Sequence, residues 1–143
     1  MNTRTTVLIA ALFALTFSVT ASAGDILSEL DAANRAFARA ILAGDVDYLV
    51  NDYTDDGCVI APSTPKTCGK DAIRELWKAV IASGPKNVEI ITLAAGNEGP
   101  LAYATGDLLI TDAESTVHKN RFVLVFRKVG DAWKLHIDSW TPQ

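Results

Sequence analysis

Two residues near the end of the chain carry side chains that could move a proton. His136 and Asp138 stand two positions apart in the segment DAWKLHIDSW, whose alternating apolar and polar residues are typical of a β-strand. Residues two apart on a strand share one face of the sheet, so an imidazole and a carboxylate would lie side by side. Either group can act as a general acid or base, and a buried carboxylate can have the raised pKa that this role needs.

The same pair also has a structural interpretation. A two-residue turn at Gly130-Asp131 would set the register of the last two strands. The expected cross-strand pairs are Val125 with His136, Val123 with Asp138, and Arg121 with Trp140. Arg121 would then lie diagonal to Asp138, within reach of its long side chain. The sequence therefore leaves three roles open for this group: acid–base catalysis, anchoring of a ligand, and stabilisation of one end of the sheet.

The elements that would position these residues are helices first and strands afterwards. Apolar residues at helical spacing predict helices over residues 24–45, 45–53 and 69–84. Four long strand-like segments follow, over residues 86–99, 101–113, 114–129 and 131–142. This order favours an α+β fold in which a curved antiparallel sheet wraps around three N-terminal helices.

The N-terminal segment, residues 1–23, is predicted to be a signal peptide. One early charge, Arg4, precedes an apolar run from Val7 to Val19, and the segment ends in Ala21-Ser22-Ala23, which a signal peptidase accepts. The apolar run is short for a membrane span of about 20 residues. We therefore expect one domain over residues 24–143, periplasmic or secreted, with no membrane association after cleavage. The net charge of −4 and the lack of a basic run argue against a nucleic-acid partner.

The two cysteines, Cys58 and Cys68, flank the turn-rich residues PSTP. A hairpin centred on Ser63 would bring them face to face, and paired cysteines of exported proteins usually form a disulfide. A redox pair or a metal site is less favoured, because the spacing is not C-x-x-C and no histidine is close in sequence. With two histidines in the whole chain and no cofactor motif, we expect neither a metal nor a cofactor.

The segments YTDDGCVIAP and CGKDAIRELW, followed by long strands that end in W-x-L-x-x-D-x-W, resemble the nuclear transport factor 2-like superfamily. The nearest pattern is that of its small ketosteroid isomerase-like and polyketide cyclase (SnoaL-like) domains. The resemblance implies a cone-shaped, cystatin-like fold that encloses one apolar pocket. It also implies frequent formation of homodimers through the outer face of the sheet.

The resemblance argues against the reaction of ketosteroid isomerase itself. That enzyme uses a carboxylate base together with a tyrosine and a protonated aspartic acid as donors to the enolate oxygen. The matching positions here are Ala61, Phe37 and Val123, none of which can take a proton or stabilise an oxyanion.

The resemblance and the expected strand register together indicate which residues would contact a ligand. The expected set is Phe37, Tyr53, Trp77, Arg121, Val123 and Trp140, with His136 and Asp138 as polar points. Apolar walls with few polar groups suit a small hydrophobic molecule. We therefore expect an exported domain that binds such a ligand. The alternatives are an isomerase, dehydratase or cyclase that uses Asp138 or His136, and a module whose role is to dimerise.

Overall fold

The computed structural model describes residues 23–143, so the predicted leader lies outside the described residues apart from Ala23. Its helices are α1 (Ala23–Ala43), α2 (Val46–Asn51) and α3 (Lys70–Ala82). None of the helices described is both long and apolar enough to cross a membrane. The predicted helices match these elements except at Tyr53, which begins the first strand and does not belong to α2.

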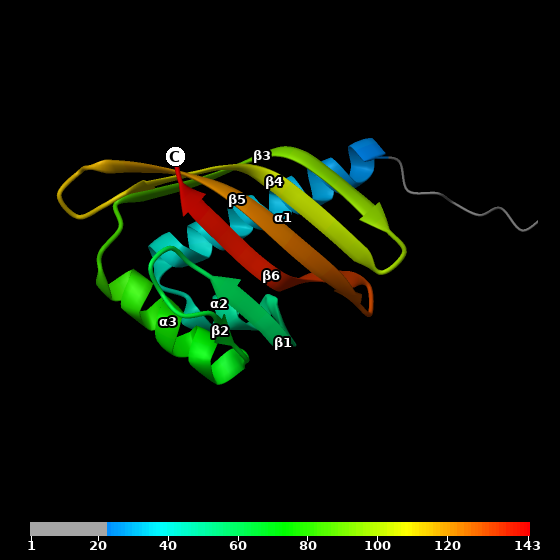
Figure 1. Cartoon of the computed structure of the whole chain (residues 1–143), viewed down its shortest axis with the longest axis horizontal. Coiled ribbons are helices and arrows are strands. Elements are labelled where there is room, and N and C mark those ends of the chain that lie inside the picture. Colours follow the sequence, from blue (N-terminus) through cyan, green and yellow to red (C-terminus); the bar gives the residue numbers. More distant parts are fainter. Residues whose placement is uncertain (1–22) are drawn as a thin grey trace, which may run out of the picture.

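The strands form one curved, unclosed sheet (Figure 1). Their bounds are β1 (Tyr53–Ile60), β2 (Thr67–Cys68), β3 (Asn87–Glu98), β4 (Leu101–Thr111), β5 (Val117–Val129) and β6 (Ala132–Pro142). The order across the sheet is β2-β1-β6-β5-β4-β3. Neighbouring strands run antiparallel as predicted, except that β1 runs parallel to β6. The fold is therefore the expected α+β arrangement.

The helices cover the concave side of the sheet. α1 crosses behind β3, β4 and β5, while α2 and α3 lie below it beside β1 and β2 (Figure 1). The core lies between these layers and includes the fully buried Leu30, Leu49 and Ile73. Gly106 allows β4 to pass close to β3, because a Cβ at this position would lie 1.9 Å from the carbonyl oxygen of Ile91.

The predicted hairpin around the two cysteines is present. Cys58 of β1 pairs with Cys68 of β2, and the two are joined by a disulfide that spans 10 residues of sequence. The bond ties the short strand β2, and with it the start of α3, to the sheet. The predicted disulfide between Cys58 and Cys68 is therefore confirmed.

The predicted register of the last two strands holds only next to their turn. Lys128 pairs with Trp133 as expected, but a β-bulge follows, because Phe126 pairs with Leu135 while its neighbour Val125 pairs with Ile137. The bulge leaves His136 as the extra residue. The three predicted pairs that involve Val125, Val123 and Arg121 are therefore wrong: these residues pair with Ile137, Ser139 and Thr141. Asp138 pairs with Leu124 and Trp140 with Phe122.

Candidate functional site

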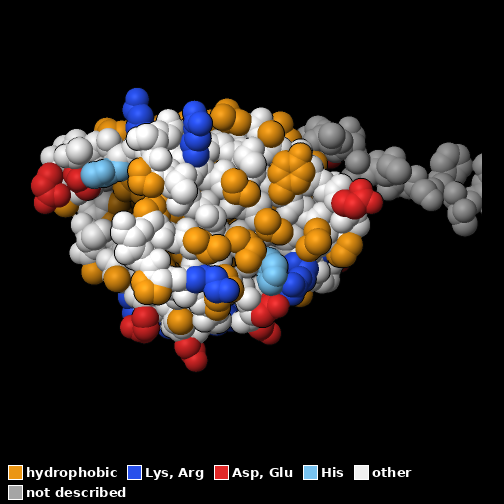
Figure 2. Space-filling view, in the orientation of Figure 1, with side chains coloured by type: hydrophobic (Ala, Val, Ile, Leu, Met, Phe, Trp, Pro, Cys, Tyr) orange, Lys and Arg blue, Asp and Glu red, His pale blue; other side chains and the backbone are white. Residues whose placement is uncertain are grey.

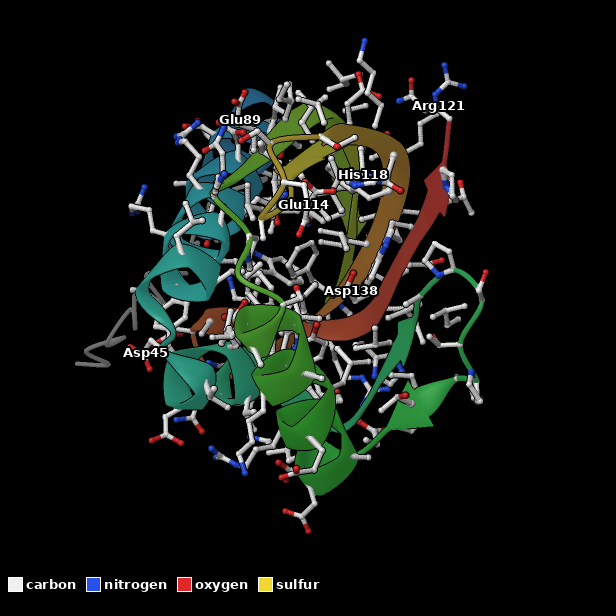
Figure 3. All side chains as sticks on the ribbon, turned by 90° about the vertical axis from the view of Figure 1, so that its left-hand side faces the viewer. Asp45, Glu89, Glu114, His118, Arg121 and Asp138 are labelled. Atoms are coloured by element: carbon white, nitrogen blue, oxygen red, sulfur yellow. A yellow bond between two sulfur atoms is a disulfide. The ribbon has the colours of Figure 1, made fainter. Side chains whose placement is uncertain are left out.

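A cavity of about 170 Å³ lies between the helices and the concave face of the sheet. α1 contributes Asn34, Phe37 and Ile41 to its walls, and α3 contributes Trp77 and Val80. The sheet contributes mainly apolar side chains and one carboxylate: Leu108, Phe122, Leu124, Leu135, Trp140 and Asp138. Figure 3 shows Asp138 between α3 and the strands of the sheet.

The carboxylate of Asp138 is held by a chain of hydrogen bonds that begins on α3. The hydroxyl of Tyr53 donates to Oδ2 of Asp138 at 2.5 Å, and the indole Nε1 of Trp77 donates to the Tyr53 oxygen at 3.3 Å. Because an indole N–H can only donate, the hydroxyl proton of Tyr53 must point to the carboxylate. Phe37 packs edge-on against both Tyr53 and Trp77 and fixes the position of their rings. Asp138 is therefore oriented by side chains from three separate elements.

One oxygen of Asp138 has no hydrogen-bond partner in the described part of the chain. Tyr53 engages Oδ2, and no hydrogen bond joins Oδ1 to any described residue. Among the described residues, Nε1 of Trp133 alone is a fully enclosed side-chain polar atom without a partner. Oδ1 therefore retains accessible surface, and Asp138 lines the cavity. A ligand in the cavity can hydrogen-bond directly to this oxygen.

Burial raises the pKa of Asp138 to about 6, with the Tyr53 hydrogen bond opposing the shift and the charge of Asp52 adding to it. Burial also raises the pKa of Asp52 to about 6, while nearby Lys134 opposes that shift. The pKa of Tyr53 lies well above its ordinary value, first because of burial and then because of the adjacent Asp138 charge. Tyr53 thus remains a neutral donor, while Asp138 can exist in either protonation state near neutral pH.

His136 does not lie beside Asp138. The bulge reverses the alternation after Leu135, so Leu135 and Asp138 are both buried although they are three positions apart. The imidazole contacts Thr54 of β1, whose Oγ1 is 3.1 Å from Nδ1, and Arg127 of β5, whose Nη2 is 2.9 Å from Nε2. His136 does not line the cavity.

The contact with Arg127 gives Nε2 of His136 the role of acceptor, because a guanidinium can only donate. Arg127 also binds Asp56 in a two-pronged ion pair, at 3.1 and 3.2 Å. Hydrogen bonds from Thr54 and Arg127 lower the pKa of Asp56. These four side chains connect β1, β5 and β6, which is the structural role that the sequence had suggested for Arg121.

Arg121 and Val123 do not lie in the cavity, which corrects the predicted set of lining residues. Both alternate along β5 with Phe122 and Leu124, which face inward. Val123 faces outward and is 53% exposed. Figure 3 shows Arg121 at one end of the sheet, near the end of β6 and well away from Asp138. Val123, the position that the resemblance matched to the protonated aspartic acid of ketosteroid isomerase, therefore does not face the cavity. The inward residues on either side are Phe122 and Leu124, so this part of the wall is still apolar.

Phe37, Trp77 and Trp140 lie in the cavity wall as expected, and Tyr53 lies behind it as the partner of Asp138. Sequence reasoning missed Asn34, Thr54 and Arg127. Asn34 could have been noticed, because it is a polar residue three and seven positions before Phe37 and Ile41, on the apolar face of its helix. Thr54 and Arg127 carry no such signal.

The fold and this cavity define the class of nuclear transport factor 2-like proteins. The model of the SnoaL-like domain family matches residues 30–137, and the chain belongs to that family. The search of curated proteins gave no match.

Solved structures with the same fold come from several bacteria. A nuclear transport factor 2-like protein with a cystatin-like fold from Novosphingobium aromaticivorans has a TM-score of 0.69 and 17% identity, over 81% of this chain and 80% of that one. A provisionally named dehydratase of the same family from Streptomyces avermitilis has a TM-score of 0.70 and 19% identity, over 82% and 95%. A ketosteroid isomerase-like protein from Erwinia carotovora atroseptica has a TM-score of 0.63 and 20% identity, over 81% and 95%. At such identities the likeness shows the fold alone.

Proposed function

We propose that this protein binds a small hydrophobic molecule in the cavity and that Asp138 accepts or donates a hydrogen bond to the ligand's polar group. The observation that carries the proposal is a cavity-lining carboxylate whose Oδ2 is held by Tyr53 and whose Oδ1 has no partner among the described residues. A hydrogen bond to a charged group contributes roughly 1.5–3 kcal/mol, so a ligand that pairs with Oδ1 gains affinity and a defined orientation.

Two adjacent residues of β5 offer a matched test. Leu124 faces the cavity and Val123 faces outward. Trp77 and Trp140 line the cavity, so a bound aromatic probe should change the tryptophan fluorescence. We expect p-cresol to bind the natural protein saturably. Leu124→Trp should fill the cavity and abolish binding, whereas Val123→Trp should leave it intact. Equal binding by both variants, or no saturable binding by the natural protein, would refute the proposal.

Proton transfer on the bound molecule is a second candidate, and the raised pKa of Asp138 favours it. As a carboxylate, Asp138 could take a proton from a carbon next to a carbonyl group and, as the acid, return one to the same molecule. Cyclohexanone in heavy water is a suitable probe, because exchange of its α-hydrogens is visible by NMR. We expect catalysed exchange to be lost in Asp138→Asn and kept in His136→Gln. Loss in His136→Gln alone would contradict this assignment.

We also propose that the protein works in an oxidising compartment outside the cytoplasm, as the predicted signal peptide suggests. The disulfide between Cys58 and Cys68 supports this proposal, because such bonds persist mainly in exported proteins.

Assembly into a homodimer through the outer face of the sheet is part of the same proposal. The supporting observation is a set of exposed apolar side chains on β4 and β5, among them Leu101, Tyr103 and Val123. Figure 2 shows hydrophobic side chains spread over this face. Apolar surface of this kind often marks a protein interface.

A further inference from the structure

We propose that the ligand is a neutral molecule of about one ring in size with polar groups at two opposite ends, one bound by Asp138 and the other by Asn34. This inference rests on the proposed function of the cavity and adds the chemical class of its ligand. Asn34 becomes a residue that determines specificity.

Asn34 has hydrogen-bonding capacity that the protein does not use. It is 3% exposed, and its one side-chain hydrogen bond among the described residues is from Nδ2 to Oγ1 of Thr92, at 2.9 Å. A carboxamide offers a second N–H and an oxygen with two lone pairs. The oxygen of Asn34 accepts no hydrogen bond from a described residue and is not among the fully enclosed, unpaired side-chain atoms of the described chain. Asn34 lines the cavity, so its carboxamide is available to a ligand there.

Thr92 holds Asn34 in place. The hydroxyl lies at a bulge of β3, where the pairing with β4 shifts between Thr92 and Ala94. The contact joins α1 to β3 and removes the freedom of the carboxamide to rotate away from the cavity. An amide fixed in this way on an otherwise apolar helix face is positioned to form a hydrogen bond with a polar group of the ligand.

The two polar points lie on different walls. Asn34 projects from α1 and is anchored to β3, at one edge of the sheet, whereas Asp138 belongs to β6, with β5 and β4 in between. The wall between them is apolar and includes Phe122, Leu124 and Leu108. A ligand that pairs with both points needs an apolar body with polar groups at opposite ends.

Size and charge restrict the class further. The cavity of about 170 Å³ is close to the ~150 Å³ of an engineered cavity that binds benzene. No lysine or arginine lines the cavity within the described part of the chain. An anionic ligand would therefore meet the Asp138 carboxylate without compensation, so hydroxyl or carbonyl groups are the expected polar ends.

Three probes test this inference: toluene, p-cresol and 4-hydroxybenzyl alcohol, which carry zero, one and two polar groups on one ring. Dissociation constants are measured at pH 7 for the natural protein and for Asn34→Leu. In the natural protein, 4-hydroxybenzyl alcohol should bind at least as tightly as p-cresol, because its second hydroxyl pairs with Asn34. In Asn34→Leu the same hydroxyl has no partner, and binding should weaken about tenfold relative to p-cresol.

Toluene controls for the integrity of the cavity, since its affinity should be equal or higher in Asn34→Leu. If p-cresol binds but the second hydroxyl weakens binding equally in both proteins, this inference is wrong and the proposed function stands. If no probe binds the natural protein, both are wrong. Should Asn34→Leu fail to fold, the natural protein still decides, because a weaker affinity for 4-hydroxybenzyl alcohol than for p-cresol contradicts the inference.

Discussion

The hydroxyl of Tyr53 donates a hydrogen bond to Oδ2 of Asp138 across 85 residues of sequence. Both groups are buried, and Trp77 completes the chain from the other side. Tyr53→Phe removes this donor while keeping the ring. The variant should lose about 1–3 kcal/mol of unfolding free energy, since Oδ2 and the Trp77 N–H both lose a partner. The pKa of Asp138 should rise above about 6, because the hydrogen bond lowers it.

Urea denaturation and carboxyl-carbon NMR titration measure the two effects. Tyr103→Phe is the matched control, because Tyr103 is 49% exposed on the outer face of the sheet. An unchanged Asp138 pKa in Tyr53→Phe would show that the contact does not operate in solution.

Asp138 should make the protein less stable as the pH rises. Its pKa is raised from 3.8 to about 6 on folding, so the folded state binds more protons than the unfolded state between these values. The contribution of Asp138 to the free energy of unfolding is fully present below about pH 4 and is lost as the pH rises through about 6. Above that pH, the free energy of unfolding should be lower by an amount on the order of 2–3 kcal/mol. Asp138→Asn keeps an acceptor for Tyr53 but removes the pH-dependent contribution of the carboxyl group to stability.

Unfolding free energies at pH 5 and 7.5 test the sign. The free energy of unfolding should decrease less between these two pH values in Asp138→Asn than in the natural protein. The decrease that remains should come from Asp52, whose pKa is also raised to about 6. Asp131→Asn, in the turn before β6, is the control. A steeper decrease in Asp138→Asn than in the natural protein would contradict the raised pKa.

Gly106 should tolerate no side chain. In Gly106→Ala the new Cβ would lie 1.9 Å from the backbone oxygen of Ile91 and 2.9 Å from the ring of Phe122, so β3 or β4 must move. We expect a loss of more than about 2 kcal/mol of stability together with weaker probe binding, because Phe122 lines the cavity. Gly99→Asn is the control, since a Cβ there meets nothing within 4 Å and asparagine tolerates the positive φ of 55°. Equal melting temperatures for both variants would disprove the close approach.

The disulfide should contribute to stability. Replacing Cys58 and Cys68 by serine should cost roughly 2–3 kcal/mol for a bridge that spans 10 residues. The intact mass of periplasmic protein, purified without reductant, should be lower by two hydrogen atoms than the reduced mass. Dithiothreitol should lower the melting temperature of the natural protein and leave the double variant unchanged. Two titratable thiols in the unreduced protein would contradict the bond.

The outer face of the sheet should carry the proposed dimer. Val123→Glu places a charge in the middle of this face and should convert a dimer to a monomer in size-exclusion chromatography with light scattering. Val129→Glu is a matched control, because Val129 is 52% exposed against 53% for Val123 but lies beside the turn after β5. A monomeric natural protein would end the proposal, and loss of the dimer in both variants would place the interface elsewhere.

The sequence by itself determined the kinds of element and their order. Helical spacing on α1 and α3, strand-like segments after residue 86, and turn residues between the cysteines are local patterns, and local patterns specify helices, strands and a hairpin disulfide. The inward positions of Phe37 and Trp77 also followed, because each lies on the apolar face of its helix, whereas the inward position of Trp140 was implied by the family resemblance.

The tertiary structure alone decided which polar groups share the cavity. The bulge at His136 depends on how β5 and β6 pair across space, and one extra residue moves His136 from the face of Asp138 to a contact with Arg127. The same shift places Arg121 and Val123 on the outer face of the sheet, opposite to the face of Asp138. Asn34 and Tyr53 gain their roles from partners 58 and 85 residues away, Thr92 and Asp138, and no local pattern encodes contacts over such distances.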